Sequence, residues 1–134
     1  MIEQILIDTD VIIDHLRGIE EARKLLKAVE NGRLSAYFST ITEVELYSGN
    51  KMEGKAEKRR AQLLLDLMHR VDVNGEIAGK AGELCRRYQI ELPNALIAAT
   101  AIRVRAKLVT RNIKHYETIK KLTIKTPTEI LVSQ

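Results

Sequence analysis

The chain has 134 residues, 45% of them hydrophobic and 30% charged, so it can bury a core as one domain without disulfides or a structural metal. Its single cysteine excludes an internal disulfide and a cysteine-rich zinc site, and its 4% of aromatic residues disfavours recognition of bases by aromatic stacking. The 22 lysines and arginines against 18 acids give a modest net charge of +4.

Short apolar runs alternate with helical periods along the whole chain. The predicted strands are, in chain order, 5–7, 34–39, 71–73, 107–110 and 122–125. The predicted helices are 11–16, 22–29, 42–49, a long helix through 51–68, then 75–89 and 94–105, with the tail 127–134 unassigned. Strands separated by helices indicate an α/β fold, an α/β/α sandwich whose mostly parallel sheet has about five strands.

The charge and hydropathy patterns bear on partners and location. Residues 103–125 contain eight lysines and arginines and one acid, Glu117. This concentration suggests a polyanionic partner, although a solvated face explains it equally well. No apolar run approaches the length of a membrane span, and we therefore expect a cytoplasmic protein with no membrane partner.

Polar residues follow the predicted strands at their carboxyl ends, where ligands gather in a parallel sheet. These residues are Asp8, Thr9 and Asp10 after the first strand, Ser39 and Thr40 after the second, and Thr110, Arg111 and Asn112 after the fourth. Two helices that begin near the same edge add Glu45 and Asn94. An oxygen-only cluster without histidine or cysteine suits Mg²⁺ or Mn²⁺.

Each of these residues also has a purely structural interpretation. Asp10 is expected to cap the helix that follows it, and Asn94 after Pro93 is an ordinary capping arrangement. Glu45 taken alone would be a surface glutamate. Asp8 is harder to explain in this way, because an acid at the end of an apolar strand is costly unless something binds it.

Four segments, taken together, point to a known family. They are ILIDTDVIIDHLRG, STITEVELYSGN, LPNALIAATAI and LVTRNIKHY. In this order and at these spacings they resemble the PIN-domain ribonucleases, most closely the VapC-type toxins of type II toxin–antitoxin systems, and the match covers nearly all of a single PIN-like domain, 1–134. The resemblance places the family's first metal-binding aspartate at Asp8 and its glutamate at Glu45. Its third and fourth acidic positions fall on Asn94 and Asn112, which are amides here.

The resemblance implies hydrolysis of RNA phosphodiesters assisted by one or two Mg²⁺ or Mn²⁺ ions. Asp8 would be the primary ligand, Glu45 a second ligand or the group that orients the water, and Asn94 and Asn112 would occupy the remaining ligand positions. Thr110 would contact the metal shell or a phosphate, and Arg111 would hold the RNA backbone. The expected partners are the RNA substrate, a VapB-like antitoxin and a second copy in a homodimer, with the helices around 41–49 and 61–68 as candidate interfaces.

Asn94 leaves several alternatives open. Its amide keeps the shape of an aspartate but removes a charge, so we expect weaker metal binding and reduced or lost activity. The natural site has one fewer acid, or aspartate was replaced to silence a ribonuclease that harms its host; we favour the second. A catalytically dead domain that binds RNA or protein is the main alternative, and a haloacid dehalogenase-type phosphatase built on ILIDTDVII is a weaker one. The roles of Asp10, Asp14 and Glu43 and the RNA target stay undetermined at this level.

Overall fold

The structure is a computed structural model that describes residues 2–134. Its strands are β1 (Glu3–Ile7), β2 (Leu34–Ser39), β3 (His69–Val71), β4 (Lys107–Val109) and β5 (Ile124–Lys125). Its α-helices are α1 (Thr9–Leu16), α2 (Glu20–Glu30), α3 (Thr40–Tyr47), α4 (Lys55–Leu65), α5 (Gly75–Tyr88), α6 (Leu92–Val104) and α7 (Pro127–Val132). Two short 3₁₀ helices, η1 (Asn50–Glu53) and η2 (Ile113–His115), lie between them. Within residues 2–134, no helix has the length and apolar character needed to cross a membrane.

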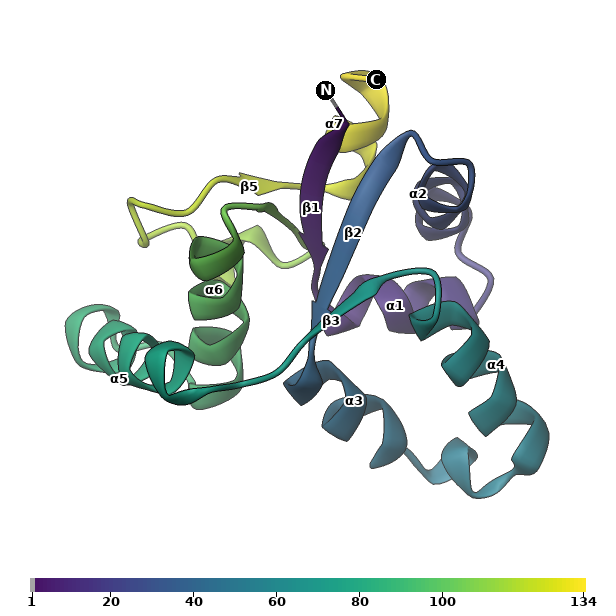
Figure 1. The fold of residues 1–134 in the computed structure, drawn as a ribbon, viewed down its shortest axis with the longest axis horizontal. Coiled ribbons are helices and arrows are strands. Elements are labelled where there is room, and N and C mark those ends of the chain that lie inside the picture. The colour runs from purple at the N-terminus through teal and green to yellow at the C-terminus, as the bar shows by residue number, and fades with distance from the viewer. Residues whose placement is uncertain (1) are drawn as a thin grey trace.

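The strands form one parallel sheet in the order β3-β2-β1-β4-β5 within the described chain. Helices α5 and α6 cover one face, and α1, α2 and α4 cover the other (Figure 1). This confirms the predicted α/β/α sandwich. Strand order reverses between β1 and β4, because the chain first adds β2 and β3 on one side of β1 and later adds β4 and β5 on the other. The carboxyl ends of β1 and β4 therefore border the crevice in which such folds bind ligands.

Side-chain alternation along the strands divides the core into two halves. Ile5 and Ile7 of β1 pack with α1, α2 and α7 on one face, whereas Leu6 between them packs with α5 and α6 on the other. Because both faces are covered, β1 is apolar throughout its second half and buried at every position from Ile5 to Ile7. Cys85 is partly buried against the α5–α6 half.

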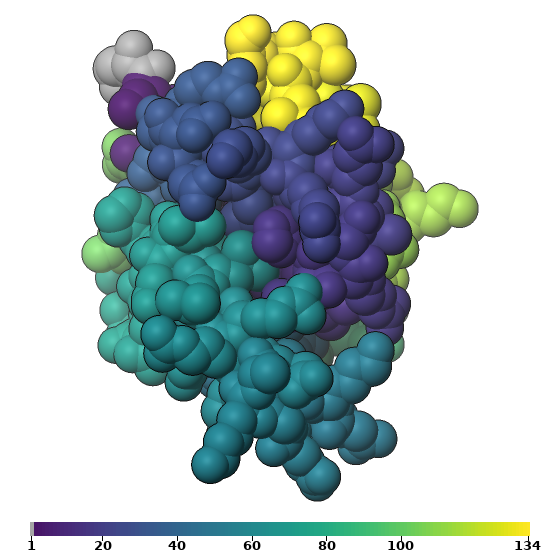
Figure 2. All heavy atoms as spheres, turned by 90° about the vertical axis from the view of Figure 1, so that its right-hand side faces the viewer, coloured from purple at the N-terminus to yellow at the C-terminus, as the bar shows by residue number. Residues whose placement is uncertain are grey.

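The predicted long helix through 51–68 is wrong. Gly54 has an extended backbone, with φ −75° and ψ 137°, and separates η1 from α4. The helical stripe resumes only where Ala61, Leu64 and Leu65 face the core. Figure 2 shows α2 and α4 next to each other on one face of the molecule, with the segment around η1 projecting below them.

The third strand and the C-terminal tail also differ from what the sequence indicates. The third strand covers His69–Val71, so Val73 lies outside it and is exposed. The unassigned tail forms α7, which begins with a capping box in which Thr126 and Glu129 satisfy each other's backbone N–H groups. This helix packs beside α2 and closes one end of the core.

Candidate functional site

Asp8 lies directly after β1 and is only 7% exposed. Its Oδ1 accepts a hydrogen bond from the Thr9 backbone N–H at 2.8 Å, and its Oδ2 accepts from the hydroxyls of Thr110 and Tyr116, both at 2.9 Å. Burial raises the pKa of Asp8 despite these three hydrogen bonds, and the negative charge of Glu45 raises it further. The carboxylate is thus fixed in position by neutral donors while its charge stays uncompensated.

Hydrogen bonds that involve two buried threonines hold Glu45 near Asp8. The Thr9 hydroxyl donates to Glu45 Oε1 at 2.7 Å, and the hydroxyls of Thr9 and Thr42 lie 2.9 Å apart. Both threonines are buried, so Glu45 on α3 is held against the first turn of α1. The side chain that looked like a surface glutamate therefore faces the site.

Asp10 is not the predicted helix cap, because Asp8 occupies that position and Asp10 lies inside the first turn of α1. Its Oδ2 accepts from the Arg111 backbone N–H and the Asn112 side-chain N–H, both at 3.0 Å, and lies 3.3 Å from the Thr110 hydroxyl oxygen, which is closer to Asp8. Burial and the charge of Asp8 raise the pKa of Asp10 to about 6. Within residues 2–134, its buried Oδ1 has no hydrogen-bond partner.

Asn94 also departs from its predicted capping role. Helix α6 begins at Leu92 with Glu91 before it, so Asn94 is the helix's third residue and points toward the site. Its Oδ1 lies 3.3 Å from the hydroxyl of Tyr116. Tyr116 is fully buried and was absent from the predicted site. The only available signal was its place in LVTRNIKHY, where a tyrosine resembles any buried aromatic residue.

Thr110 and Arg111, which the sequence predicts to contact the metal shell or the RNA backbone, differ in exposure. Thr110 is fully buried, and its hydroxyl donates to Asp8 Oδ2. Arg111 Nε donates to Asp14 Oδ2 at 2.8 Å, and the arginine side chain remains 57% exposed. Asp14 therefore holds the Arg111 guanidinium at the rim of the site.

The basic stretch 103–125 does not collect on the site's rim as a whole. Strand β4 runs through this stretch. Lys107 begins the strand and Thr110 follows its last residue, so the two lie about 10 Å apart along the strand. Lys107 pairs with Glu3 at the far edge, and Arg103 pairs with Glu76. Only part of the positive charge in residues 103–125 is thus available near Asp8.

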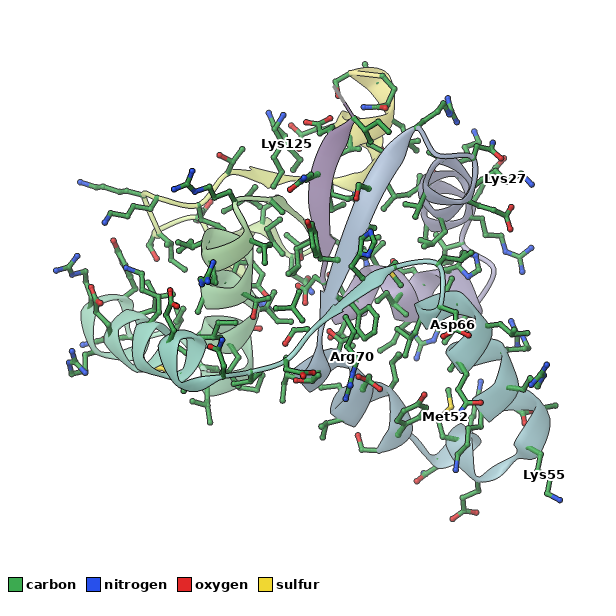
Figure 3. All side chains as sticks on the ribbon, viewed as in Figure 1. Lys27, Met52, Lys55, Asp66, Arg70 and Lys125 are labelled. Atoms are coloured by element: carbon green, nitrogen blue, oxygen red, sulfur yellow. The ribbon has the colours of Figure 1, made fainter. Side chains whose placement is uncertain are left out.

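Glu43, whose role the sequence left undetermined, is directed away from the site. Its carboxylate pairs with Arg70 on β3, and Figure 3 shows Arg70 beside α3. Two glutamates two residues apart on the same short helix therefore have separate roles, with Glu45 at the site and Glu43 at a peripheral ion pair.

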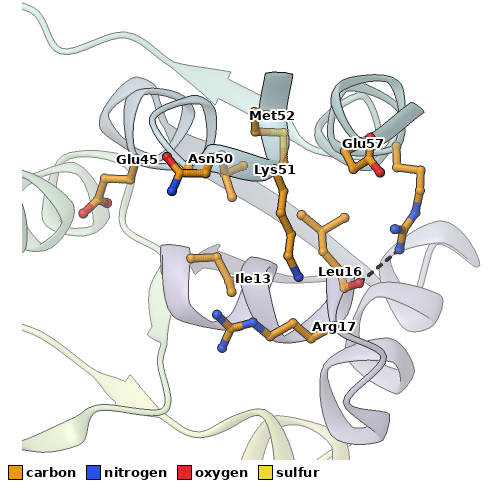
Figure 4. Close-up of a pocket in the computed structure, with 11 residues that line it drawn as sticks. Ile13, Leu16, Arg17, Glu45, Asn50, Lys51, Met52 and Glu57 are labelled. Atoms are coloured by element: carbon orange, nitrogen blue, oxygen red, sulfur yellow. Dashed lines mark hydrogen bonds between the residues drawn. The ribbon is translucent and has the colours of Figure 1, made fainter. Parts of the chain in front are cut away.

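A groove of about 410 Å³ opens beside Glu45 between α1, α3, η1 and α4. Its floor is apolar, with Ile13, Leu16 and Leu46 among the lining residues. Arg17 and Lys51 also line it, and in Figure 4 Lys51 extends from η1 across the groove toward α1. The groove joins apolar surface and positive charge to the acidic site.

The donor set suits a hard divalent cation. Among residues 2–134, none of the ion pairs involves Asp8, Asp10 or Glu45, and the nearby charge of Arg111 only partly offsets that of Asp10. In the same part of the chain, no three His, Cys, Asp or Glu side chains are arranged to hold a metal ion. Position 94 supplies an amide in place of a carboxylate. The site thus offers buried carboxylate charge with a reduced number of acidic ligands.

Comparisons with known proteins agree with this fold. A model of the PIN domain family matches residues 5–121. Ribonuclease VapC10 of Mycobacterium tuberculosis is 36% identical over 124 residues, covering 88% of this chain and 90% of that protein. Ribonuclease VapC19 of the same organism is 34% identical over 116 residues, covering 83% and 90%.

Solved structures show the same architecture. A toxin–antitoxin complex from Klebsiella pneumoniae superposes with a TM-score of 0.75 at 31% identity, covering 91% of this chain and 96% of that chain. VapBC2 from Rickettsia felis, bound to a DNA fragment from its promoter, gives a TM-score of 0.76 at 21% identity, covering 92% and 98%. The chain therefore belongs to the PIN-domain family and, within it, to the VapC type.

Proposed function

We propose that the chain is a metal-dependent endoribonuclease and the toxin of a toxin–antitoxin pair. The observation that supports this most is the buried carboxylate of Asp8, which has hydrogen-bond donors but no cationic partner within residues 2–134. The relatives of this protein, VapC10 and VapC19, are named ribonucleases.

Asp8 and Glu45 would hold Mg²⁺ or Mn²⁺, with Asn94 as a neutral third ligand. Asp8 Oδ1 accepts a single hydrogen bond, so it keeps lone-pair capacity for a cation. Thr9 and Thr42 keep Glu45 from rotating toward solvent, and Thr110 and Tyr116 hold Asp8. A bound divalent cation would lower the pKa of a water molecule and offset charge on the phosphate.

Asn112 is less suited to the role of a metal ligand. Its side-chain N–H donates to Asp10, and its backbone N–H bonds to the Thr110 hydroxyl. We propose that Asn112 and Asp10 fix the turn after β4, and that Asp10 acts on the site through Thr110 rather than through the metal. Arg111 at the rim and the groove residues Arg17 and Lys51 would bind the RNA backbone electrostatically.

An antitoxin partner and a homodimer are part of this proposal. The Klebsiella pneumoniae relative is described as a toxin–antitoxin complex. Val44 on α3 is 61% exposed, Leu63 on α4 is 53% exposed, and Leu67, two residues after α4 ends, is 39% exposed. These side chains lie within the segments 41–49 and 61–68, which the sequence marks as candidate interfaces.

A second candidate is a domain that binds RNA without cutting it. Asn94 and Asn112 support it, because two of the four acidic positions implied by the resemblance are neutral. The phosphatase alternative has no support now that the PIN family is assigned.

RNA cleavage assays with Mg²⁺ or Mn²⁺ separate the two candidates. The nuclease proposal predicts cleavage by the parent chain that is abolished by chelation and by Asp8→Asn. If the parent binds RNA without cutting it and only Asn94→Asp cuts, this chain is a binding domain on a nuclease scaffold. If neither protein binds metal or cuts RNA, both the metal site and the ribonuclease activity are wrong.

A further inference from the structure

Tyr116 lies between the two residues whose roles matter most at the site. Its hydroxyl oxygen is 2.9 Å from Asp8 Oδ2 and 3.3 Å from Asn94 Oδ1. The side chain is fully buried, so water does not compete for the hydroxyl. A buried phenol must place its one proton on one acceptor.

The acceptor that receives this proton is Asp8. A carboxylate is a stronger acceptor than an amide oxygen, and the distance to Asp8 is the shorter one. The Tyr116 oxygen then presents a lone pair to Asn94. An amide oxygen facing that lone pair would leave two acceptors in contact, which is unfavourable in a buried site.

Asparagine can resolve this conflict and aspartate cannot. A half-turn about the last side-chain bond of Asn94 exchanges Oδ1 and Nδ2 with little change in shape. Nδ2 then donates to Tyr116, and Oδ1 turns away from it. An ionised carboxylate at position 94 has no hydrogen to donate and would add negative charge beside Asp8, Asp10 and Glu45, all of which already act on the Tyr116 hydroxyl.

We propose that Tyr116 is a positioning residue in a directed hydrogen-bond chain, in which Asn94 Nδ2 donates to the Tyr116 hydroxyl and that hydroxyl donates to Asp8 Oδ2. The chain leaves Asn94 Oδ1 and Asp8 Oδ1 as the oxygens that face a cation; this last step rests on the proposed function. Asn94 is therefore an integral part of the hydrogen bonding in this protein, whether or not the site also binds metal.

The hydrogen-bond chain can be tested by NMR on the intact protein without metal. The parent should show a nuclear Overhauser effect between the Asn94 side-chain N–H protons and the Tyr116 ring. Tyr116→Phe keeps the ring and removes the hydroxyl, so exchange of the Asn94 N–H protons with water should become roughly fivefold faster, as expected for one lost hydrogen bond. Tyr37→Phe is the control, since the Tyr37 hydroxyl faces Gln4 and not the site.

A second measurement addresses metal binding. Mn²⁺ should bind Tyr116→Phe about tenfold more weakly than the parent, because the removed hydroxyl orients the primary carboxylate. In the absence of metal, Asn94→Asp should lower the melting temperature by about 4 °C, since a donor is replaced by a charge. Tyr37→Phe should leave both quantities unchanged.

The outcomes separate this proposal from the proposed function. Absence of the Asn94–Tyr116 effect in the parent, or unchanged exchange in Tyr116→Phe, overturns the hydrogen-bond chain even if the protein cuts RNA. The predicted exchange change in a protein that binds no Mn²⁺ supports the hydrogen-bond chain and contradicts the proposed metal site. If Tyr116→Phe fails to fold, the nuclear Overhauser effect between Asn94 and Tyr116 in the parent still tests the hydrogen-bond chain.

Discussion

The parallel strands begin at one side of the sheet, the amino edge, and end at the other, the carboxyl edge, and these two edges hold their acids in different ways. At the amino edge, Glu3 pairs with Lys107 and accepts a hydrogen bond from Gln134, with solvent nearby. At the carboxyl edge, Asp8 is buried and held by two hydroxyls and a backbone N–H. A lysine neutralises a carboxylate, whereas neutral donors fix its position and leave its charge available. The carboxyl edge therefore keeps uncompensated negative charge, whereas the carboxylate at the amino edge is already neutralised.

Removing one acid at each edge should give the largest difference. Asp8→Asn should reduce RNA cleavage by at least about 100-fold, since the metal's contribution to catalysis is several kcal/mol. The same change should raise the melting temperature without metal, because it removes a buried charge. Glu3→Gln should leave cleavage unchanged and alter stability by less than about 1 kcal/mol. Equal losses of cleavage in the two variants would remove the distinction between the edges.

Asp10 and Asn112 provide a test within the carboxyl edge. Asn112→Asp should lower the free energy of unfolding by about 2 kcal/mol, because it sets two carboxylates together and removes a donor. Combining it with Asp10→Asn restores one donor and one acceptor, so the double variant should be more stable than Asn112→Asp. Urea denaturation with a chelator measures both. A double variant as unstable as the sum of its parts would show that the two side chains do not form a pair.

The pKa of Asp10 predicts a smaller, pH-dependent effect. Because burial raises this pKa to about 6 from 3.8, the folded protein binds a proton between these pH values that the unfolded chain does not. The cost of the buried charge is therefore present above pH 6 and is relieved as the pH falls toward 4. In metal-free thermal melts, the stability of the parent relative to Asp10→Asn should therefore increase as the pH is lowered from 6 to 4. Parallel pH profiles for the two proteins would contradict it.

Glu43 and Glu45 allow the smallest comparison, on a single helix. Glu43→Gln breaks only its pair with the solvent-exposed Arg70, so stability should change little and RNA cleavage should not change. Glu45→Gln should reduce cleavage, because it removes a charge that Thr9 directs into the site. Reduced cleavage in Glu43→Gln would show that the site extends further toward β3.

The sequence predicted the sheet well because apolar runs mark strands that are buried on both faces. It placed Asp8 and Glu45 at one edge for the same reason, since strand and helix boundaries determine where those side chains begin. It did not predict the break at Gly54, because a helical stripe is visible on both sides of that residue.

Other features depend on contacts between residues distant in the chain. The capping prediction for Asp10 used only its neighbours, whereas its actual partners are Thr110 and the two residues after it, about a hundred positions away. Tyr116 was missed for a similar reason, since its hydroxyl gains a role only when the turn after β4 packs against β1 and α6. Local patterns identify elements, but they do not specify which polar groups meet between them.

Thermal unfolding with and without Mn²⁺ tests the central claim most directly. A site of buried, unneutralised carboxylates should bind Mn²⁺ only when folded, so the melting temperature of the parent should rise with Mn²⁺ concentration. The rise should disappear in Asp8→Asn and persist in Glu3→Gln. An unchanged melting temperature in the parent, or an equal rise in Asp8→Asn, would contradict the assignment of a cation site to this edge of the sheet.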